Sequence, residues 1–349
     1  MPNISIILSS YNDEKTIKRC LDSVLAQENA DLQMECLVVD DCSSDSTLDI
    51  IRHEVGAYKG PIKFRILRHK TYHGLSRTRN TGFERATGDY VMFVNATDVL
   101  RPDCMDVYIA NLMRYWDVDI IAGNVLNHAN NQNLFTSLTS AMALRGRGEV
   151  ICQEMLRNHL YLFAWNKLIR RDLLMSNNIR FDENLAYADI QWAFDVFSSV
   201  TSIALIPEVT YAFTVREATT ISLAEKRANA LLSSYAATCD HLLNQTPRPE
   251  GAGTNYYLDY QLFVYGLLQS AQQVTEEYNV LPQIKRELSN MRSRLTSQTH
   301  SDGQRKLALF FVQDASLFSG MIKLSAFRHY TDVVADVVAQ LATIVGQKT

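Results

Sequence analysis

Short runs of strand-forming residues alternate with helical segments along the N-terminal part of the chain. The runs end in polar turns, and they are Ile4–Leu8, Cys36–Val39, Lys63–Leu67 and Tyr90–Val94. The segments between them that predict helices are 15–27, 50–55 and 77–86, and in the first of these apolar side chains recur every three or four residues. This alternation predicts an α/β fold with a parallel sheet, right-handed crossovers and flanking helices.

Polar residues gather in the turns that follow the predicted strands. Ser10 follows the first strand, Asp40 and Asp41 end the second, and residues 95–98 follow the fourth. In open parallel sheets, ligands bind in a crevice beyond the carboxyl ends of the strands. We therefore expect these side chains to face one crevice. No GxGxxG motif follows the first strand, which disfavours a dinucleotide-binding enzyme.

The pattern becomes almost purely helical after residue 222. The candidate helices are 223–243, 256–274, 284–295, 305–312 and 331–345, and the best candidate linker is 247–253. We predict an α/β domain over residues 1–222 and an all-helical domain over residues 223–349. The helical part shows no catalytic motif. Its apolar stripes predict a core, a contact with an oligomer mate or partner, or a face at the membrane edge.

Charge and hydropathy narrow the class of protein. The 349 residues include 34 Lys and Arg against 38 Asp and Glu, which gives a net charge of −4. This composition lacks the excess of basic residues that is typical of proteins that bind nucleic acid. No run reaches the roughly 18 apolar residues of a membrane span. The apolar run at 4–8 is too short for a signal peptide and follows no Lys or Arg. We expect a cytoplasmic protein with at most peripheral contact at the inner face of the membrane.

Cysteine and histidine give no sign of a metal site. The six cysteines are scattered without a CxxC pair, which predicts reduced thiols. The histidines at 69, 73, 128 and 159 show no metal-ligand spacing with one another. We expect these histidines at the surface or as satisfied core residues.

Several motifs follow one another in the order that is typical of one enzyme family. They are Ser9–Asn12, Val38–Asp45, His73–Gly82, Gly88–Val94, Trp165–Leu168 and Arg180–Asp189. Over about residues 1–220 the chain resembles the family 2 glycosyltransferases, which have the GT-A nucleotide-sugar fold with a mixed, mostly parallel sheet. The resemblance implies inverting transfer of a sugar from a UDP-sugar to a carbohydrate or lipid-linked glycan acceptor. It also implies a place in bacterial surface-polysaccharide synthesis.

Residues at the expected crevice suit a nucleotide-sugar donor. The carboxylate of Asp41 can accept the imide hydrogen of a uracil ring, and the resemblance implies this role. Backbone groups around Ser10 can hold the rest of the nucleoside. The guanidinium of Arg79 suits a diphosphate, because its fork of donors matches phosphate oxygens. Since Asp is also favoured in turns and helix caps, Asp41 has a structural alternative.

The acidic motif of the family is altered in this chain. The family pattern Asp-x-Asp-Asp binds ribose and a divalent metal, whereas this chain has Asn95-Ala96-Thr97-Asp98. Asn95 and Thr97 remain candidates for binding the donor, and Asp98 is either a ligand for Mn²⁺ or Mg²⁺ or a cap. Because these ions prefer anionic oxygens, the loss of two carboxylates weakens metal binding. Other cations could replace a metal, and the candidates are Arg77, Arg79, Arg101 and Lys167.

The acceptor side also departs from the family pattern. The resemblance makes Asp189 the general base that deprotonates the acceptor hydroxyl, but its usual acidic neighbour is replaced by Ala188. Asp189 can instead cap a helix over 190–197. Trp165 can stack against a sugar or belong to the core. Tyr211 lies where the family closes its catalytic domain near the donor.

These departures leave three interpretations open. The chain is a metal-independent transferase, an enzyme with a different donor, or a non-catalytic GT-A-like subunit that assembles with an active glycosyltransferase through its C-terminal helices. Asn95, Thr97 and Ala188 favour the non-catalytic subunit. The enzyme is favoured by four retained residues, which are Asp41, Arg79, Asp98 and Asp189.

Overall fold

The computed structural model describes residues 2–27, 33–115, 117–131, 139–146, 163–214, 221–244 and 279–298. The chain divides into two compact units. Unit 1 comprises Met1–Ile151, Phe163–Asn184 and Trp192–Val215, and unit 2 comprises Cys152–Leu162, Leu185–Gln191 and Arg216–Thr349. A domain boundary at residue 222 stays a prediction.

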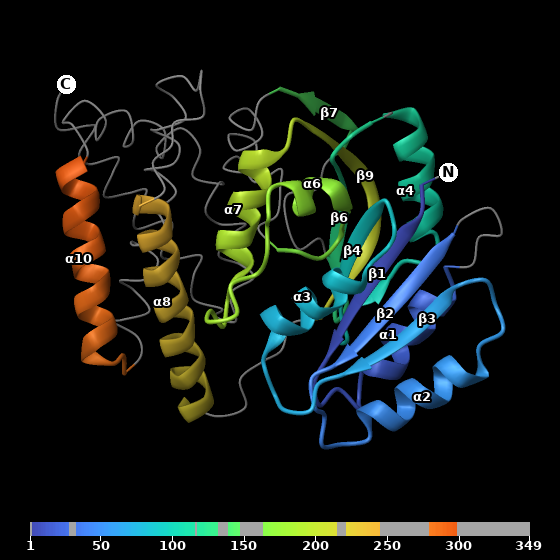
Figure 1. Cartoon of the computed structure of the whole chain (residues 1–349), viewed down its shortest axis with the longest axis horizontal. Helices are drawn as coiled ribbons and strands as arrows, with labels where there is room; N and C mark the ends of the chain where they lie inside the picture. Colours follow the sequence, from blue (N-terminus) through green and yellow to red (C-terminus); the bar gives the residue numbers. More distant parts are fainter. Residues whose placement is uncertain are drawn as a thin grey trace. The chain divides into compact units, whose positions relative to one another are not determined.

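Unit 1 begins with four parallel strands that alternate with three helices, as the sequence predicts. In chain order they are β1 (Ile4–Ser10), α1 (Ile17–Leu25), β2 (Met34–Asp40), α2 (Thr47–Ala57), β3 (Lys63–Arg68), α3 (Leu75–Arg85) and β4 (Tyr90–Asn95). β1 lies between β2 and β4, and β2 also pairs with β3. Helices α1 and α2 cover one face of this sheet and α3 covers the other (Figure 1). Because both faces are covered, every residue of β1 is buried.

The remaining strands extend the sheet, mainly by antiparallel pairing. The elements are β5 (Val99–Leu100), α4 (Cys104–Arg114), β6 (Ile120–Asn127), β7 (Met142–Arg145), β8 (Lys167–Arg170), α6 (Arg171–Ser176), α7 (Asp189–Ser199) and β9 (Ser202–Phe213). The strand order is β3-β2-β1-β4-β8-β6-β9-β5, with β7 paired to β9. β8 is antiparallel to β4 and β6, whereas β9 is parallel to β6. The predicted mixed sheet with flanking helices is confirmed.

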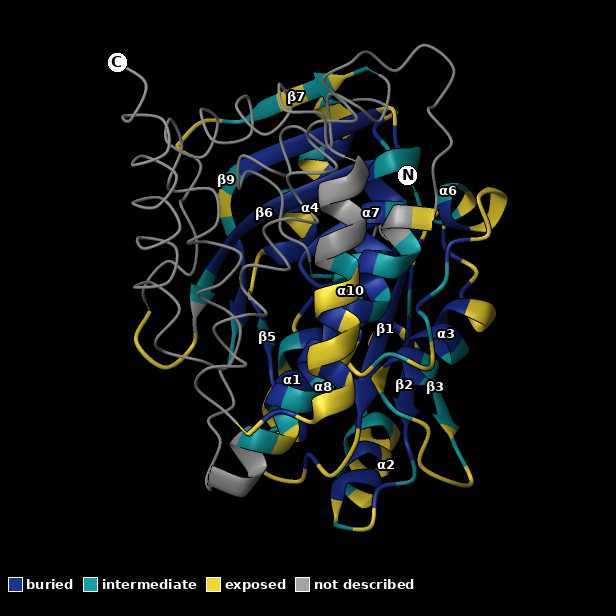
Figure 2. Cartoon of the chain, turned by 90° about the vertical axis from the view of Figure 1, so that its left-hand side faces the viewer, coloured by how far each residue is buried: buried dark blue, intermediate teal, exposed yellow. Residues whose placement is uncertain are grey.

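The core of unit 1 lies against the central strands of the sheet. The residues of β1, β2 and β4 are almost all buried (Figure 2). Helix α3 approaches β1 and β2 closely at Gly82, where a Cβ atom would overlap Cγ2 of Ile7 and lie 3.3 Å from Cγ2 of Val39. Glycine permits this close approach, which sets the height of α3 above the sheet. The same helix carries Arg79.

The described part of unit 2 contains two long helices, α8 (Ile221–Asn244) and α10 (Pro282–Gln298). Asn229 of α8 links them, because its Nδ2 donates to the carbonyl of Asn279 at 3.0 Å and its Oδ1 accepts the N–H of Leu281 at 2.9 Å. The predicted helices 223–243 and 284–295 are confirmed. The predicted helices 256–274, 305–312 and 331–345 lie outside the described residues, so a C-terminal helical domain stays a prediction.

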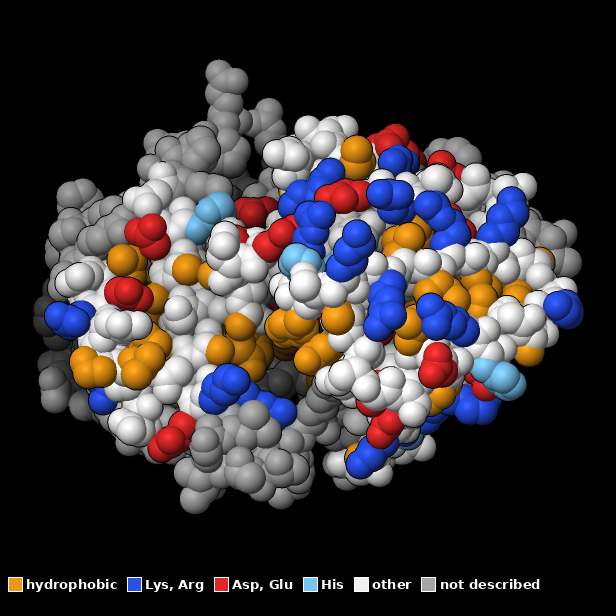
Figure 3. Space-filling model, turned by 60° about the horizontal axis from the view of Figure 1, so that its bottom comes forward, with side chains coloured by type: hydrophobic (Ala, Val, Ile, Leu, Met, Phe, Trp, Pro, Cys, Tyr) orange, Lys and Arg blue, Asp and Glu red, His pale blue; other side chains and the backbone are white. Residues whose placement is uncertain are grey.

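The described residues fit the expectation of reduced thiols. The five cysteines among them are free, and they are Cys20, Cys36, Cys42, Cys104 and Cys239. On the face shown in Figure 3, basic and acidic side chains are interspersed. None of the described helices is both long enough and apolar enough to cross a membrane.

Candidate active site

The turns after β1 and β2 form one hydrogen-bonded edge at the carboxyl end of the sheet. The N–H of Asn12 donates to Oγ of Ser43 at 3.0 Å, and the N–H of Ser44 donates to Oδ1 of Asn12 at 2.9 Å. Asn12 and Cys42 adopt left-handed φ values of 50° and 62°. Much of the polarity of these turns therefore serves to hold the two strand ends together.

Two serine hydroxyls lie at the end of β1. Ser9 and Ser10 are buried, and neither hydroxyl has a hydrogen-bond partner among the described residues. The carbonyl of Ser10 accepts the N–H of Asp41 at 2.9 Å, which places the two chain positions side by side. An unpaired buried hydroxyl costs free energy. These two hydroxyls therefore mark the strand end as a candidate for contact with a polar ligand.

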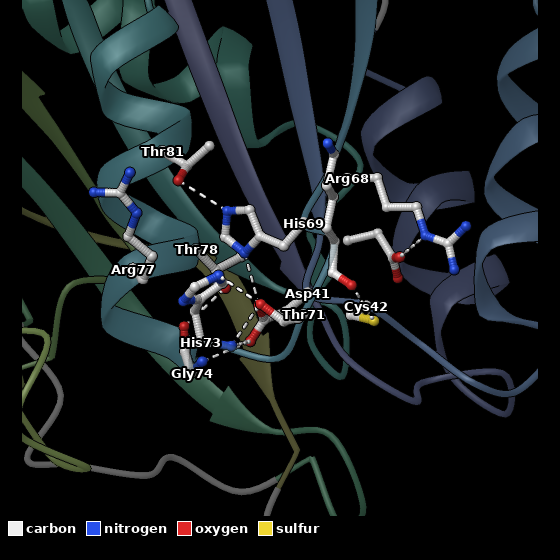
Figure 4. Close-up of polar contacts among 12 residues, drawn as sticks. Asp41, Cys42, Arg68, His69, Thr71, His73, Gly74, Arg77, Thr78 and Thr81 are labelled. Atoms are coloured by element: carbon white, nitrogen blue, oxygen red, sulfur yellow. Dashed lines mark hydrogen bonds and ion pairs between the residues drawn. The ribbon is translucent and has the colours of Figure 1, made fainter.

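Asp41 follows β2, and three donors from the segment between β3 and α3 enclose its carboxylate (Figure 4). Oδ1 accepts from Nδ1 of His69 at 2.7 Å and from the N–H of His73 at 3.0 Å, while Oδ2 accepts from the N–H of Gly74 at 2.6 Å. The side chain of Asp41 is only 2% exposed. Gly74 has a φ of 93°, which suits the sharp entry into α3. Asp41 thus fixes the start of α3, in addition to any contact that it makes with a ligand.

A second network joins α3 to the turn after β4. Nη2 of Arg79 donates to Oδ1 of Asn95 at 3.1 Å, and Nδ2 of Asn95 donates to Oδ2 of Asp98 at 2.9 Å. Arg79 is buried, and its guanidinium lies 5.0 Å from the ring centroid of Phe181. The structure therefore brings Arg79 together with Asn95 and Asp98 of the altered motif.

The carboxylate of Asp98 is fully buried among donors. Oδ1 accepts from Oγ1 of Thr97 at 3.1 Å and from the N–H of Thr214 at 3.0 Å. Oδ2 accepts from the hydroxyl of Tyr211 at 2.8 Å as well as from Asn95. Burial raises the pKa of Asp98 from 3.8 to about 6, and these hydrogen bonds oppose the rise. Asp98 thereby ties the turn after β4 to the end of β9.

The oxygen atoms of the turn 95–98 are not arranged to coordinate a divalent metal ion. The oxygens of Asp98 accept four hydrogen bonds, the hydroxyl of Thr97 donates one of them, and Oδ1 of Asn95 faces the Arg79 guanidinium. Mn²⁺ and Mg²⁺ prefer several anionic oxygens, and here such an ion would meet a positive charge instead. In the part of the chain that the structure describes, no three His, Cys, Asp or Glu side chains are grouped to hold a metal.

Asp189 is the first residue of α7 and is half-buried. A carboxylate in the first turn interacts favourably with a helix N-terminus, so the structural alternative for Asp189 remains open. Ala188, which precedes it, is buried. Asp189 belongs to unit 2, whereas Asp41 and Arg79 belong to unit 1. Its role as general base stays a prediction.

The candidate cations occupy very different surroundings. Arg77 pairs with Glu183 at 3.1 Å and is half-buried. Arg101 is exposed. Lys167 is buried, and its Nζ donates to the carbonyl of Phe163 at 2.6 Å. Arg79, which contacts the altered turn directly, is therefore the best placed of the four.

Trp165 belongs to the core of unit 1. Its side chain is 2% exposed. Its ring stacks against those of Phe163, Tyr211 and Phe213, at centroid distances of 5.1, 5.2 and 5.0 Å. Of the two interpretations of Trp165, the structure supports the core residue rather than a platform for a sugar.

Two residues that hold the site together, His69 and Arg19, were not predicted from the sequence. His69 contacts Asp41, and a usable signal was present, because His69 lies two residues after the third predicted strand and must lie at the same edge of the sheet. Arg19 of α1 donates from Nη2 to the carbonyl of Thr97 at 3.0 Å. That contact joins positions far apart in the chain, so no local sequence pattern predicts it.

Residues 5–176 match the sequence profile described as "Glycosyl transferase family 2". These residues belong to glycosyl transferase family 2. One relative of this glycosyltransferase is "Uncharacterized glycosyltransferase YibD" of Escherichia coli (strain K12). It is 24% identical over 326 residues, which are 90% of this chain and 89% of YibD. Another is the poly(ribitol-phosphate) beta-N-acetylglucosaminyltransferase TarS of Staphylococcus aureus (strain MW2). It is 26% identical over 220 residues, which are 62% of this chain and 36% of TarS.

Solved structures of two glycosyltransferases share the fold. TarS 1-349 of S. aureus in complex with UDP-GlcNAc superposes with a TM-score of 0.69 at 18% identity, covering 98% of this chain and 92% of that structure. The mannosyltransferase PcManGT of Pyrobaculum calidifontis, in complex with GDP-Man and Mn²⁺, gives a TM-score of 0.56 at 15% identity. It covers 100% of this chain and 88% of that one. These likenesses confirm the predicted GT-A-like fold of the glycosyltransferase.

Proposed function

We propose that this glycosyltransferase transfers a sugar with inversion from a UDP-sugar to a hydroxyl group of a carbohydrate or polymeric acceptor. One observation carries the proposal: Asp41 and the Arg79–Asn95 pair lie at the carboxyl edge of the parallel strands β1, β2 and β4, which fall within the residues that match family 2. TarS has a similar fold, was crystallised with UDP-GlcNAc, and is named for poly(ribitol-phosphate). UDP-GlcNAc is therefore the first donor to test, and hydroxyl-rich wall or surface polymers are the first acceptors.

Each part of the donor has a candidate partner in unit 1. Asp41 binds the imide N–H of the uracil ring, and the end of β1 around Ser10 holds the rest of the nucleoside. Asn95 and Thr97 contact the ribose. Arg79 interacts with the diphosphate, because a guanidinium offers several N–H donors to phosphate oxygens.

Charge on the leaving diphosphate is balanced by Arg79 rather than by a metal at the turn 95–98. The support is the 3.1 Å contact from Arg79 to Asn95, together with the four hydrogen bonds that occupy Asp98. A buried positive charge next to the diphosphate stabilises the charge that develops as the bond to the sugar breaks.

The reaction needs a base for the acceptor. The carboxylate of Asp189 takes the proton of the acceptor hydroxyl while the oxygen attacks the anomeric carbon from the face opposite UDP. The bond between that carbon and the phosphate oxygen breaks, and UDP leaves with the electron pair. A positioned general base contributes about 10²–10⁴-fold to the rate, and positioning of donor and acceptor contributes further.

A second candidate function is a non-catalytic subunit that binds a nucleotide sugar and assembles with an active transferase. The observation that favours it is the replacement of acidic residues of the family pattern at Asn95, Thr97 and Ala188. The same assay separates the two candidates.

The test measures release of UDP from UDP-GlcNAc, with and without a panel of hydroxyl-rich polymers, alongside UDP affinity by calorimetry. We expect Asp189→Asn to lose about 10²–10⁴-fold in rate while keeping its UDP affinity. Asp41→Asn should lose UDP affinity. Asp172→Asn is the matched control, because this α6 side chain is 85% exposed and should behave as wild type.

The possible results of these assays distinguish the transferase from the non-catalytic subunit. UDP-GlcNAc binding without UDP release for any acceptor supports the non-catalytic subunit. Absence of binding to any uridine nucleotide overturns both candidates. An Asp189→Asn variant with the wild-type rate removes Asp189 from the mechanism.

A further inference from the structure

His69 lies between two polar side chains at the edge where the proposed donor binds. It follows β3, and its N–H donates to the carbonyl of Asp40 at 2.9 Å, which continues the pairing of β2 with β3. Nδ1 of its ring contacts Oδ1 of Asp41 at 2.7 Å, and Nε2 contacts Oγ1 of Thr81 at 2.9 Å (Figure 4). The side chain is 11% exposed. The ring is therefore held at both nitrogens.

The contacts assign the state of the ring nitrogens. An ionised carboxylate only accepts hydrogen bonds, so Nδ1 carries the hydrogen that Asp41 accepts. A threonine hydroxyl both donates and accepts, so Thr81 satisfies Nε2 in either protonation state. His69 thus supplies Asp41 with a hydrogen bond from a donor whose direction is set by α3.

The geometry leaves Asp41 one acceptor position. A carboxylate accepts roughly four hydrogen bonds, and His69, His73 and Gly74 supply three donors. The N–H of His73 is shared between Oδ1 at 3.0 Å and Oδ2 at 3.2 Å, so the three donors leave the carboxylate about one acceptor position. That position accepts the N3–H of uracil, whereas N3 of cytosine is itself an acceptor and would face the negative charge.

We propose that His69 is a positioning residue that orients Asp41 for uracil and so sets the preference of the site for uridine over cytidine nucleotides. This inference rests on the proposed UDP-sugar function. Without the His69 hydrogen bond, a second acceptor position opens on Oδ1, and only the N–H groups of His73 and Gly74 still direct the carboxylate. A role confined to the stability of the fold would not change the ratio of the two affinities.

The experiment measures the dissociation constants of UDP and CDP by calorimetry for the full chain and its variants. We expect His69→Ala to weaken UDP binding by about tenfold, as for loss of a hydrogen bond to a charged group, and to leave CDP binding unchanged. His69→Asn should keep most of the preference, because its amide nitrogen takes the place of Nδ1. His53→Ala is the control, since this α2 side chain is 79% exposed.

A second pair of variants keeps the test decisive if His69→Ala does not fold. His69→Gln directs its amide toward Thr81 instead of Asp41, so it should lose the preference that His69→Asn keeps. Equal UDP-to-CDP ratios in wild type and His69→Ala, or in the Asn and Gln variants, would overturn the role of His69. Failure of the wild-type chain to bind UDP would instead overturn the proposed function.

Discussion

The close packing of α3 on the sheet can be tested with two glycines that both lie in helices. At Gly82 of α3, an added Cβ overlaps Ile7 and lies 3.3 Å from Val39. At Gly56 of α2, nothing lies within 4 Å of an added Cβ. Replacing a helical Gly by Ala stabilises a helix by about 0.5–1 kcal/mol, whereas overpacking a core costs about 1–3 kcal/mol. Gly56→Ala should therefore stabilise the protein, and Gly82→Ala should destabilise it by about 1–2 kcal/mol.

Urea denaturation followed by circular dichroism measures both changes. The two variants should move the midpoint in opposite directions without changing the slope. Gly82→Ala should also weaken UDP binding, because a displaced α3 moves Arg79 away from Asn95. Equal stabilisation by both substitutions would refute the close approach of α3 to β1 and β2, and with it the placement of Arg79.

Three further predictions concern the edge of the sheet. Cys42→Gly should raise the free energy of unfolding by about 0.5–1 kcal/mol, because the φ of 62° favours glycine, whereas Cys42→Ala should not; denaturation curves check both. The raised pKa of Asp98 means that its contribution to stability is full below pH 3.8 and is lost as the pH rises to about 6. The stability of wild type relative to Asp98→Asn should thus fall by about 3 kcal/mol across that range, and a pH-independent difference would contradict the burial of a charged carboxylate. The double variant Asn95→Asp/Thr97→Asp should bind Mn²⁺ about tenfold more tightly than wild type in a titration followed by electron paramagnetic resonance, since anionic oxygens determine that affinity; equal affinities would contradict our explanation of the altered turn.

The N-terminal half of the fold was predictable because its signals are local. Each of β1 to β4 is a compact run that ends in a polar turn, and parallel pairing follows from the helices between the strands. The positions of Asp41 and of the turn 95–98 at one edge follow from the same reasoning. The insertion of β8 between β4 and β6 was not predictable, since antiparallel pairing across such a distance leaves no periodic signal.

The roles of individual side chains were harder to predict than their positions. Asp98 fits a metal ligand by sequence, but the hydroxyl of Tyr211 and the N–H of Thr214 reach it only once β9 is in place. Trp165 likewise fits a sugar platform until its stacking against Tyr211 is seen. Burial and saturation of polar groups depend on tertiary contacts, which residue types alone do not reveal.

The charge arrangement at the altered turn motivates the most direct test of the proposed site. Calorimetric titration of the full chain with UDP-GlcNAc, in Mn²⁺-free buffer and again with Mn²⁺, measures the affinity in both conditions. We expect binding with the same affinity in the two titrations, because Arg79 rather than a metal at residues 95–98 meets the diphosphate. Binding that requires Mn²⁺, or no binding in either buffer, would contradict it.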